Sequence, residues 1–279
     1  MLGALIIVFR EVIEAGLIVG IVLAVTKGIH GRGRWIIAGV AGGIAGAALL
    51  AVFADALANA LAGVGQEIFN ACVLGLAVCM LTWHNIWMAR HGREMAAELR
   101  DAGLAVKNGS RSLAALAIVV GVAVLREGSE IVLFLYGLVI SGGSTALGLL
   151  AGSALGLLLG CAVSALTFLG LVTIPSRYLF GVTTTLITFL AAGLAAQSVL
   201  FLQQAGLITR LQATAWDSSA ILSDTSLFGR LLHTLIGYSD QPSQMQVLVY
   251  GVTLATIFTL TKLLEPGKPR AATVAHTVA

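Results

Sequence analysis

Seven long apolar segments constrain the fold of this sequence more than any other feature. A bilayer core about 30 Å thick requires about 20 apolar residues in a helix. The segments of this length are 3–26, 35–58, 67–89, 113–140, 145–170, 178–202 and 246–264. Backbone groups in lipid must be hydrogen-bonded within the protein, which excludes an open sheet. The sequence therefore predicts an all-α polytopic membrane protein with seven transmembrane helices.

The composition agrees with a chain surrounded by lipid. Charged residues make up 10% of the chain and hydrophobic residues 58%, whereas a soluble domain carries about 25% charged residues. So few polar groups cannot cover a soluble globule. The net charge of +3 gives no indication of nucleic acid, because most of the basic residues lie in loops and orient the protein. The expected surroundings are membrane lipid, with no nucleic acid as a partner.

The basic residues divide unevenly between the two sets of loops. Successive loops alternate between the two sides of the membrane. The loops on the side of the N-terminus carry only Arg210 and Arg230. The other set carries Lys27, Arg32, Arg34, Arg90, Arg93, Arg100, Lys107, Arg111, Arg177, Lys262, Lys268 and Arg270. Cytoplasmic loops collect Lys and Arg. We therefore expect the N-terminus outside and the C-terminus in the cytoplasm, which in a bacterium corresponds to a multi-pass protein of the cytoplasmic (inner) membrane with a periplasmic N-terminus.

An internal repeat divides this single membrane domain, 1–279. The stretches 10–14 and 126–130 both read Arg-Glu-x-x-Glu, and a glycine-rich span follows each. Each repeat has three spans, so the two have opposite orientations, as in transporters whose substrate site lies near the membrane midplane. The expected parts are repeat 1 (1–89), a cytoplasmic loop (90–112), repeat 2 (113–202), an outer segment (203–245), a last helix (246–264) and a cytoplasmic tail (265–279).

Two pairs of carboxylates within the spans are the main candidates for a functional site. Glu11 and Glu14 share one helix face because they are three residues apart, and the same holds for Glu127 and Glu130. A charge at the bilayer centre costs about 2.5 kcal/mol or more and normally faces the bundle interior. Two interpretations remain, structural ion pairs or an ion pathway. Duplication of the motif and its excess of acid over base favour the pathway.

Two arginines balance part of this charge. Arg10 and Arg126 precede the glutamates and are expected to keep them ionised and oriented. Four carboxylates with two arginines have a formal charge of −2, and Glu67, near the outer start of the third span, would bring it to −3. Carboxylate oxygens with surplus negative charge suit a hard multivalent cation.

Four further polar residues are weaker candidates. Asp55, near the outer end of the second span, is either an entry group or an interfacial charge. Asp217 and Asp224 in the outer segment either collect cations or shape the loop. His84 in the third span either ligates an ion or titrates, or is a satisfied histidine near the cytoplasmic face; the second interpretation is favoured.

The paired motifs resemble the oxidase-dependent iron transporter family, which includes fungal high-affinity iron permeases and EfeU-type bacterial permeases. The resemblance covers almost the whole chain, including the stretches 66–69, 87–88, 205–206, 216–219, 229–232 and 237–242. It implies an iron permease, not an enzyme, with Glu11, Glu14, Glu127 and Glu130 as translocation ligands. It also implies no permanently bound cofactor, and periplasmic partners that are iron-binding, cupredoxin-like, oxidase or peroxidase proteins.

Some alternatives stay open at this point. Fe²⁺ would neutralise a charge of −2 and Fe³⁺ a charge of −3, so charge alone does not choose between them. Another divalent cargo such as lead or manganese, or a non-transporting metal sensor or membrane enzyme, is also compatible with the motifs. Asn70 and Gln204 stand where the resembled family often carries Glu, which removes negative charge near the outer face.

Overall fold

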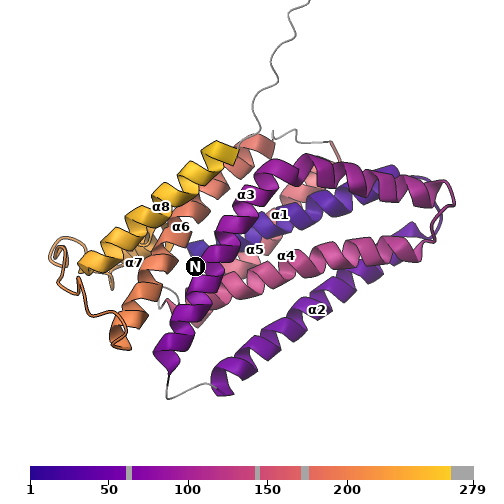
Figure 1. Cartoon of the computed structure of the whole chain (residues 1–279). Helices are drawn as coiled ribbons and strands as arrows, with labels where there is room; N and C mark the ends of the chain where they lie inside the picture. The colour runs from indigo at the N-terminus through magenta and orange to yellow at the C-terminus, as the bar shows by residue number, and fades with distance from the viewer. Residues whose placement is uncertain (61–64, 142–144, 171–175, 265–279) are drawn as a thin grey trace, which may run out of the picture.

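The computed structural model describes residues 1–60, 65–141, 145–170 and 176–264. Within these residues every regular element is a helix, so the all-α prediction is confirmed for them (Figure 1). The helices are α1 (Leu2–Val25), α2 (Arg32–Ala60), α3 (Gln66–Lys107), α4 (Ala114–Ile140), α5 (Ala146–Phe168), α6 (Ser176–Gln204), α7 (Leu227–Ile236) and α8 (Gln244–Leu264). The predicted tail, 265–279, lies outside the described residues.

Several helices are long and apolar enough to cross a membrane. Five described stretches meet both conditions, namely Arg32–Ala56, Gln66–His84, Ala146–Phe168, Gly181–Gln204 and Gln244–Leu263. With 24 and 27 residues, α1 and α4 also have the length, but each carries one arginine and two glutamates near its middle. The chain is thus a multi-pass membrane protein, while the count of seven spans stays a prediction.

The two motif helices, α1 and α4, run antiparallel. Ile7, near the start of α1, belongs to the same buried cluster as Phe134, near the end of α4. Val22, near the end of α1, shares a second cluster with Val120, near the start of α4. The Arg-Glu-x-x-Glu motifs lie between these clusters on both helices. Antiparallel packing therefore brings the two motifs to the same level.

Glycines allow α2 to pack closely on α4, and α5 on α1. A Cβ atom on Gly39 of α2 would lie 2.6 Å from the carbonyl oxygen of Ala117 in α4, and one on Gly156 of α5 would lie 2.6 Å from that of Leu5 in α1. No side chain fits at either contact, so the backbones touch, as small residues permit in membrane helices. Each motif helix is thus covered by the small-residue helix that follows the other motif.

The third helix is longer than the sequence predicts. We expected a span over 67–89 and a loop over 90–112, but α3 continues as a helix of 42 residues to Lys107. The charged stretch 94–102 is polar and yet rich in strong helix formers, so the fall in hydropathy does not mark a helix end. The helix ends at Asn108, where Gly109 adopts a φ of +76°.

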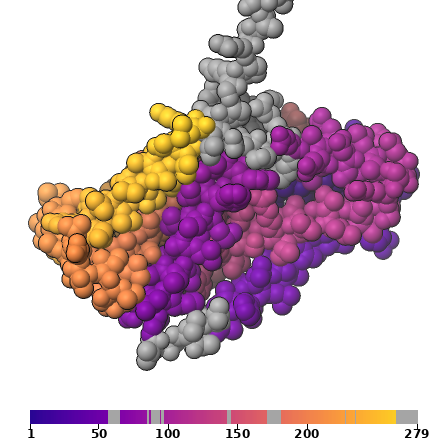
Figure 2. Space-filling model, in the orientation of Figure 1, coloured from indigo at the N-terminus to yellow at the C-terminus, as the bar shows by residue number. Residues whose placement is uncertain are grey.

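Most of the predicted outer segment (203–245), namely the part between the end of α6 and the start of α8, forms a folded cap at one end of the molecule. Figure 2 shows it at the end opposite the connection from α3 to α4. The segment contains the short helix α7, which starts after Ser226, whose side chain accepts a hydrogen bond from the Gly229 N–H. Gly237, with a φ of +70°, ends it.

Candidate metal site

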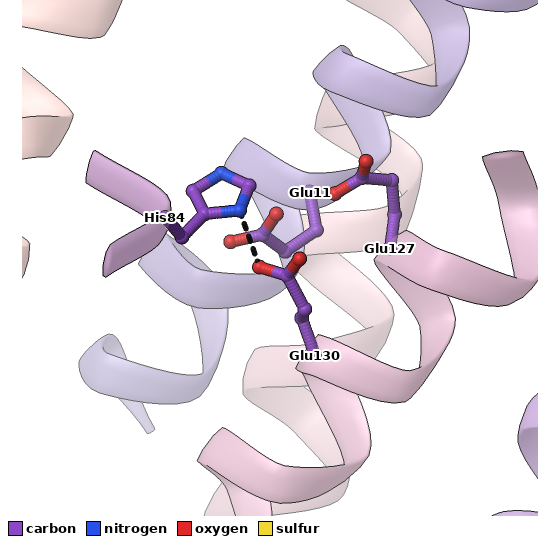
Figure 3. A group of neighbouring side chains, drawn as sticks. All are labelled: Glu11, His84, Glu127 and Glu130. Atoms are coloured by element: carbon purple, nitrogen blue, oxygen red, sulfur yellow. Dashed lines mark ion pairs between the residues drawn. The ribbon is translucent and has the colours of Figure 1, made fainter. Parts of the chain in front are cut away.

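Four buried side chains from three helices meet where α1, α3 and α4 come together. Glu11 comes from α1, His84 from α3, and Glu127 and Glu130 from α4 (Figure 3). One potential ligand atom from each lies within 4.8 Å of the others. Carboxylates of both motifs thus come together in one cluster.

Two of the carboxylates are sealed from solvent and incompletely paired. Glu11 is 0% exposed and Glu127 is 2% exposed. The Oε2 atom of each makes no hydrogen bond with any residue that the structure describes. Burying an unpaired carboxylate oxygen is costly unless a cation or a proton compensates it. A cation or a proton close to these two oxygens would therefore stabilise them.

The two arginines take different positions although their motifs match. Arg10 is 2% exposed, and its Nη1 and Nε atoms lie 3.1 Å from Glu11 Oε1 and 3.1 Å from Glu14 Oε1. The Arg126 side chain is 35% exposed, with its Nε 3.4 Å from Glu130 Oε1. Its guanidinium stacks over Trp87 at 4.6 Å. Arg10 is thus enclosed within the site, whereas Arg126 lies at its edge.

His84 joins the two motifs, a role that the sequence interpretation missed. Its Nε2 atom lies 3.1 Å from Glu14 Oε2, and its Nδ1 atom lies 2.6 Å from Glu130 Oε2. The residue is 2% exposed. The histidine is indeed satisfied on its Nε2 side, as expected, but it also stands among the potential ligands. The one available signal was a single histidine inside an otherwise apolar stretch of the third span.

Other predicted outer-face residues lie away from the cluster. Glu67 is exposed in the first turn of α3. It precedes His84 by seventeen residues, which is about 25 Å along a helix. Asp55 is exposed near the end of α2, Asn70 is half-buried near the start of α3, and Gln204 is exposed at the end of α6. The structure therefore does not bring Glu67 to the carboxylates as their expected neighbour.

The two aspartates of the outer segment bind its own backbone and side chains. Asp217 accepts hydrogen bonds from Ser219 and Gln241, which hold the pKa of that exposed carboxyl below its usual value. Asp224 and Asp240 each donate a backbone N–H to the other's carboxylate, both at 3.1 Å. Burial, together with the nearby Asp240 carboxylate, raises the pKa of Asp224. Both aspartates thus shape the loop.

A cavity of about 660 Å³ lies beside the cluster, between α1, α2, α4 and α5. Glu11 and Glu127 form part of its wall, and most of the remaining lining is apolar, as at Val12, Ala47 and Leu157. An apolar wall lowers the local dielectric and strengthens charge interactions at the two carboxylates. A cation placed beside Glu11 and Glu127 would therefore interact strongly with them.

Known proteins resemble this chain over almost its whole length. The model of the Iron permease FTR1 family matches residues 1–264. A ferrous iron permease EfeU of Escherichia coli O157:H7 is 34% identical over 254 residues, covering 89% of this chain and 90% of the relative. That of Yersinia pestis is 32% identical over 252 residues, covering 89% and 88%. No solved structure matches significantly. The chain therefore belongs to the FTR1 iron permease family, and it is a transporter rather than an enzyme.

Proposed function

We propose that the protein carries Fe²⁺ inward across the cytoplasmic membrane through the glutamates of its two Arg-Glu-x-x-Glu motifs. The observation that carries this proposal is the meeting of Glu11, Glu127 and Glu130, buried and incompletely paired, midway along two antiparallel helices. Glu14 stands one helical turn further along α1, between Arg10 and His84. It serves as the neighbouring carboxylate on the same route.

The proposal includes a topology of seven spans with a periplasmic N-terminus. The glutamates of both motifs and Arg10 are buried in the bundle, so the remaining faces of α1 and α4 can contact lipid. The packing of α2 on α4 and of α5 on α1 is what a pair of inverted three-helix repeats would produce. The distribution of Lys and Arg then orients the bundle. On this topology the motifs lie near the midplane, where inverted-repeat transporters bind their substrates.

Charge favours the ferrous ion as the cargo. Glu11, Glu14, Glu127 and Glu130 with two arginines have a formal charge of −2. The count of −3 that would suit Fe³⁺ needs Glu67, which lies about 25 Å along α3 from the cluster level. The Escherichia coli and Yersinia pestis relatives are likewise named ferrous iron permeases. A divalent ion would leave the site formally neutral.

The alternative, that the charges form purely structural ion pairs, does not account for the buried carboxylate oxygens that make no hydrogen bond with any described residue. Arg10 contacts one oxygen of Glu11 and one of Glu14, and Arg126 lies nearest to Glu130. This leaves Glu11 Oε2 and Glu127 Oε2 buried without a hydrogen bond in the described part of the chain. Ion pairs that served stability alone would complete their hydrogen bonding, because an unsatisfied buried charge destabilises a protein.

The outer segment provides a surface for a periplasmic partner that delivers iron. Apolar side chains are exposed on it, with Ile221 at 91%, Phe228 at 70% and Trp216 at 48%. The segment is held rigidly by internal contacts, including the Ser218 and Tyr238 hydroxyls at 2.7 Å. Exposed apolar patches mark protein–protein or membrane contact sites, so we place the contact with the partner at these side chains.

Uptake of Fe²⁺ into proteoliposomes under anaerobic conditions tests the assignment. We expect Glu11→Gln and Glu127→Gln each to lower uptake at least about tenfold, because each removes a charge that the ion would meet. Glu67→Gln is the matched control, since it makes the same change at an exposed glutamate of α3. Unchanged iron flux in both site variants would refute the pathway. Accumulation of iron in starved cells that express the protein tests the inward direction.

A further inference from the structure

We infer that His84 is an iron ligand and the residue that makes the site prefer Fe²⁺ to harder divalent ions such as Mn²⁺. This inference rests on the proposed function, because it concerns the same cluster of Glu11, Glu127 and Glu130. It adds a nitrogen ligand from α3 to an oxygen site formed by α1 and α4. No residue of the Arg-Glu-x-x-Glu motifs can supply such a ligand.

The orientation of the imidazole is that of a metal-binding histidine. Its Nε2 atom is hydrogen-bonded to Glu14 Oε2 at 3.1 Å, and Arg10 Nε contacts the other oxygen of Glu14 at 3.1 Å. Histidines that bind metals usually donate their second ring N–H to a carboxylate, which fixes the ring and the tautomer. In the tautomer that carries its proton on Nε2, Glu14 fills this role and the lone pair of Nδ1 faces the cluster.

The other ring nitrogen, Nδ1, lies against a carboxylate of the second motif. His84 Nδ1 lies 2.6 Å from Glu130 Oε2, as the dashed line in Figure 3 marks. Even so, the atom makes no hydrogen bond of proper geometry, and neither does Glu130 Oε2. Both residues are more than nine-tenths buried. These two buried atoms are therefore close enough to bind the same ion.

The spacing of the four ligand atoms needs little adjustment to hold one ion. They lie within 4.8 Å of one another. Two atoms bound to the same ion at about 2.1 Å are at most about 4.2 Å apart. The widest pair must therefore approach by about 0.6 Å, which rotation about side-chain torsions can provide.

A single imidazole changes the metal preference of an oxygen site. Carboxylates suit Mg²⁺, Ca²⁺ and Mn²⁺, whereas imidazole suits Fe²⁺ and the metals that follow it in the Irving–Williams order. The corresponding helix of the second half, α6, offers no compensating group, because residues 178–204 contain no His, Asp, Glu, Lys or Arg. Within the cluster that the described residues form, His84 therefore supplies the nitrogen that would separate iron from manganese.

Competition between Fe²⁺ and Mn²⁺ tests the inference. We expect His84→Gln to lower the ratio of Fe²⁺ to Mn²⁺ affinity at least roughly tenfold, the lower end of the effect of losing even an outer partner of a ligand. Binding is measured anaerobically on purified protein, and uptake of each ion is measured in proteoliposomes. His30→Gln is the matched control, since His30 is exposed in the turn before α2, and it should leave the ratio unchanged.

The ratio of Fe²⁺ to Mn²⁺ affinity in His84→Gln shows whether His84 is a ligand or has only a structural role. Loss of packing or of the Glu14 hydrogen bond would weaken both ions together and leave the ratio intact, and that result would overturn the inference. Failure of the proposed function is recognised differently, because the unmodified protein would then move no iron. The two failures are thus distinguishable.

A measurement on the unmodified protein covers the case in which His84→Gln does not fold. Pulsed electron paramagnetic resonance of bound Mn²⁺, in protein labelled with ¹⁵N-histidine, detects a directly coordinated imidazole nitrogen. We expect a ¹⁵N coupling from the ion in the cluster. Bound Mn²⁺ without such a coupling would overturn the assignment of His84 as a ligand.

Discussion

Replacing each motif arginine by methionine should destabilise the protein to very different extents. Arg10 and Arg126 occupy the same position in the two motifs, so the sequence alone predicts equal effects. In the structure Arg10 is 2% exposed and lies 3.1 Å from both Glu11 and Glu14. The Arg126 side chain is 35% exposed and lies 3.4 Å and 3.9 Å from Glu130 and Glu127. Comparing the two variants therefore separates the effect of burial on stability from the effect of the position in the motif.

The magnitudes follow from that burial. Removing one partner of a buried ion pair costs about 3–5 kcal/mol, because the remaining charge is uncompensated. Arg10→Met leaves two such carboxylates. A partly exposed pair contributes at most about 1 kcal/mol, and the stack of Arg126 on Trp87 adds about 0.5–1 kcal/mol. We therefore expect Arg10→Met to lower the free energy of unfolding by about 2–3 kcal/mol more than Arg126→Met does.

Reversible unfolding in mixed detergent micelles, followed by circular dichroism, measures this difference. Arg34→Met provides the baseline, since Arg34 is exposed at the start of α2, and it should change the unfolding free energy by less than about 0.5 kcal/mol. Equal losses for the two motif variants, or a larger loss for Arg126→Met, would refute the reasoning from burial.

Two further predictions concern helix packing and the outer segment. Gly156→Ala should destabilise the protein by about 1–3 kcal/mol in the same assay, because the new methyl group would meet the backbone of Leu5. Gly42→Ala, with no atom within 4 Å, should be neutral or stabilising, and equal losses for both would contradict the packing. Ile221→Asp should lower iron uptake in cells that contain the periplasmic partner but not uptake of free Fe²⁺ into proteoliposomes. Loss in both systems, or the same cellular loss in the exposed control Thr209→Asp, would argue against a docking surface there.

The helices and the pairing of the motifs could be predicted because they depend on local patterns. Long apolar stretches give the helices, since a helix satisfies its own backbone. The offset of three residues between Glu11 and Glu14 places both on one face. The glycines of α2 and α5 predict close packing, and Gly39 and Gly156 lie at such contacts, whereas the neighbouring Gly42 faces open space. Residue type alone does not indicate which of the glycines on a helix contacts the neighbouring helix.

What the sequence did not predict depends on the tertiary arrangement. His84 is separated from Glu14 by 70 positions, and no local signal relates them. Glu67 appeared to belong with the carboxylates by charge, but its place in the first turn of α3 keeps it at another level. The polar half of α3 was taken for a loop because hydropathy reports burial in lipid, not helix formation. The different exposure of Arg10 and Arg126 likewise arises from their neighbours.

Anomalous diffraction at the iron edge, from crystals grown anaerobically with Fe²⁺, tests the central claim most directly. The account predicts one principal peak within about 2.1–2.3 Å of oxygens from Glu11, Glu127 and Glu130 and of His84 Nδ1. It also predicts that Glu11→Gln greatly weakens this peak. A principal peak elsewhere, for example at Glu67 or on the outer segment, with none between α1 and α4, would contradict it.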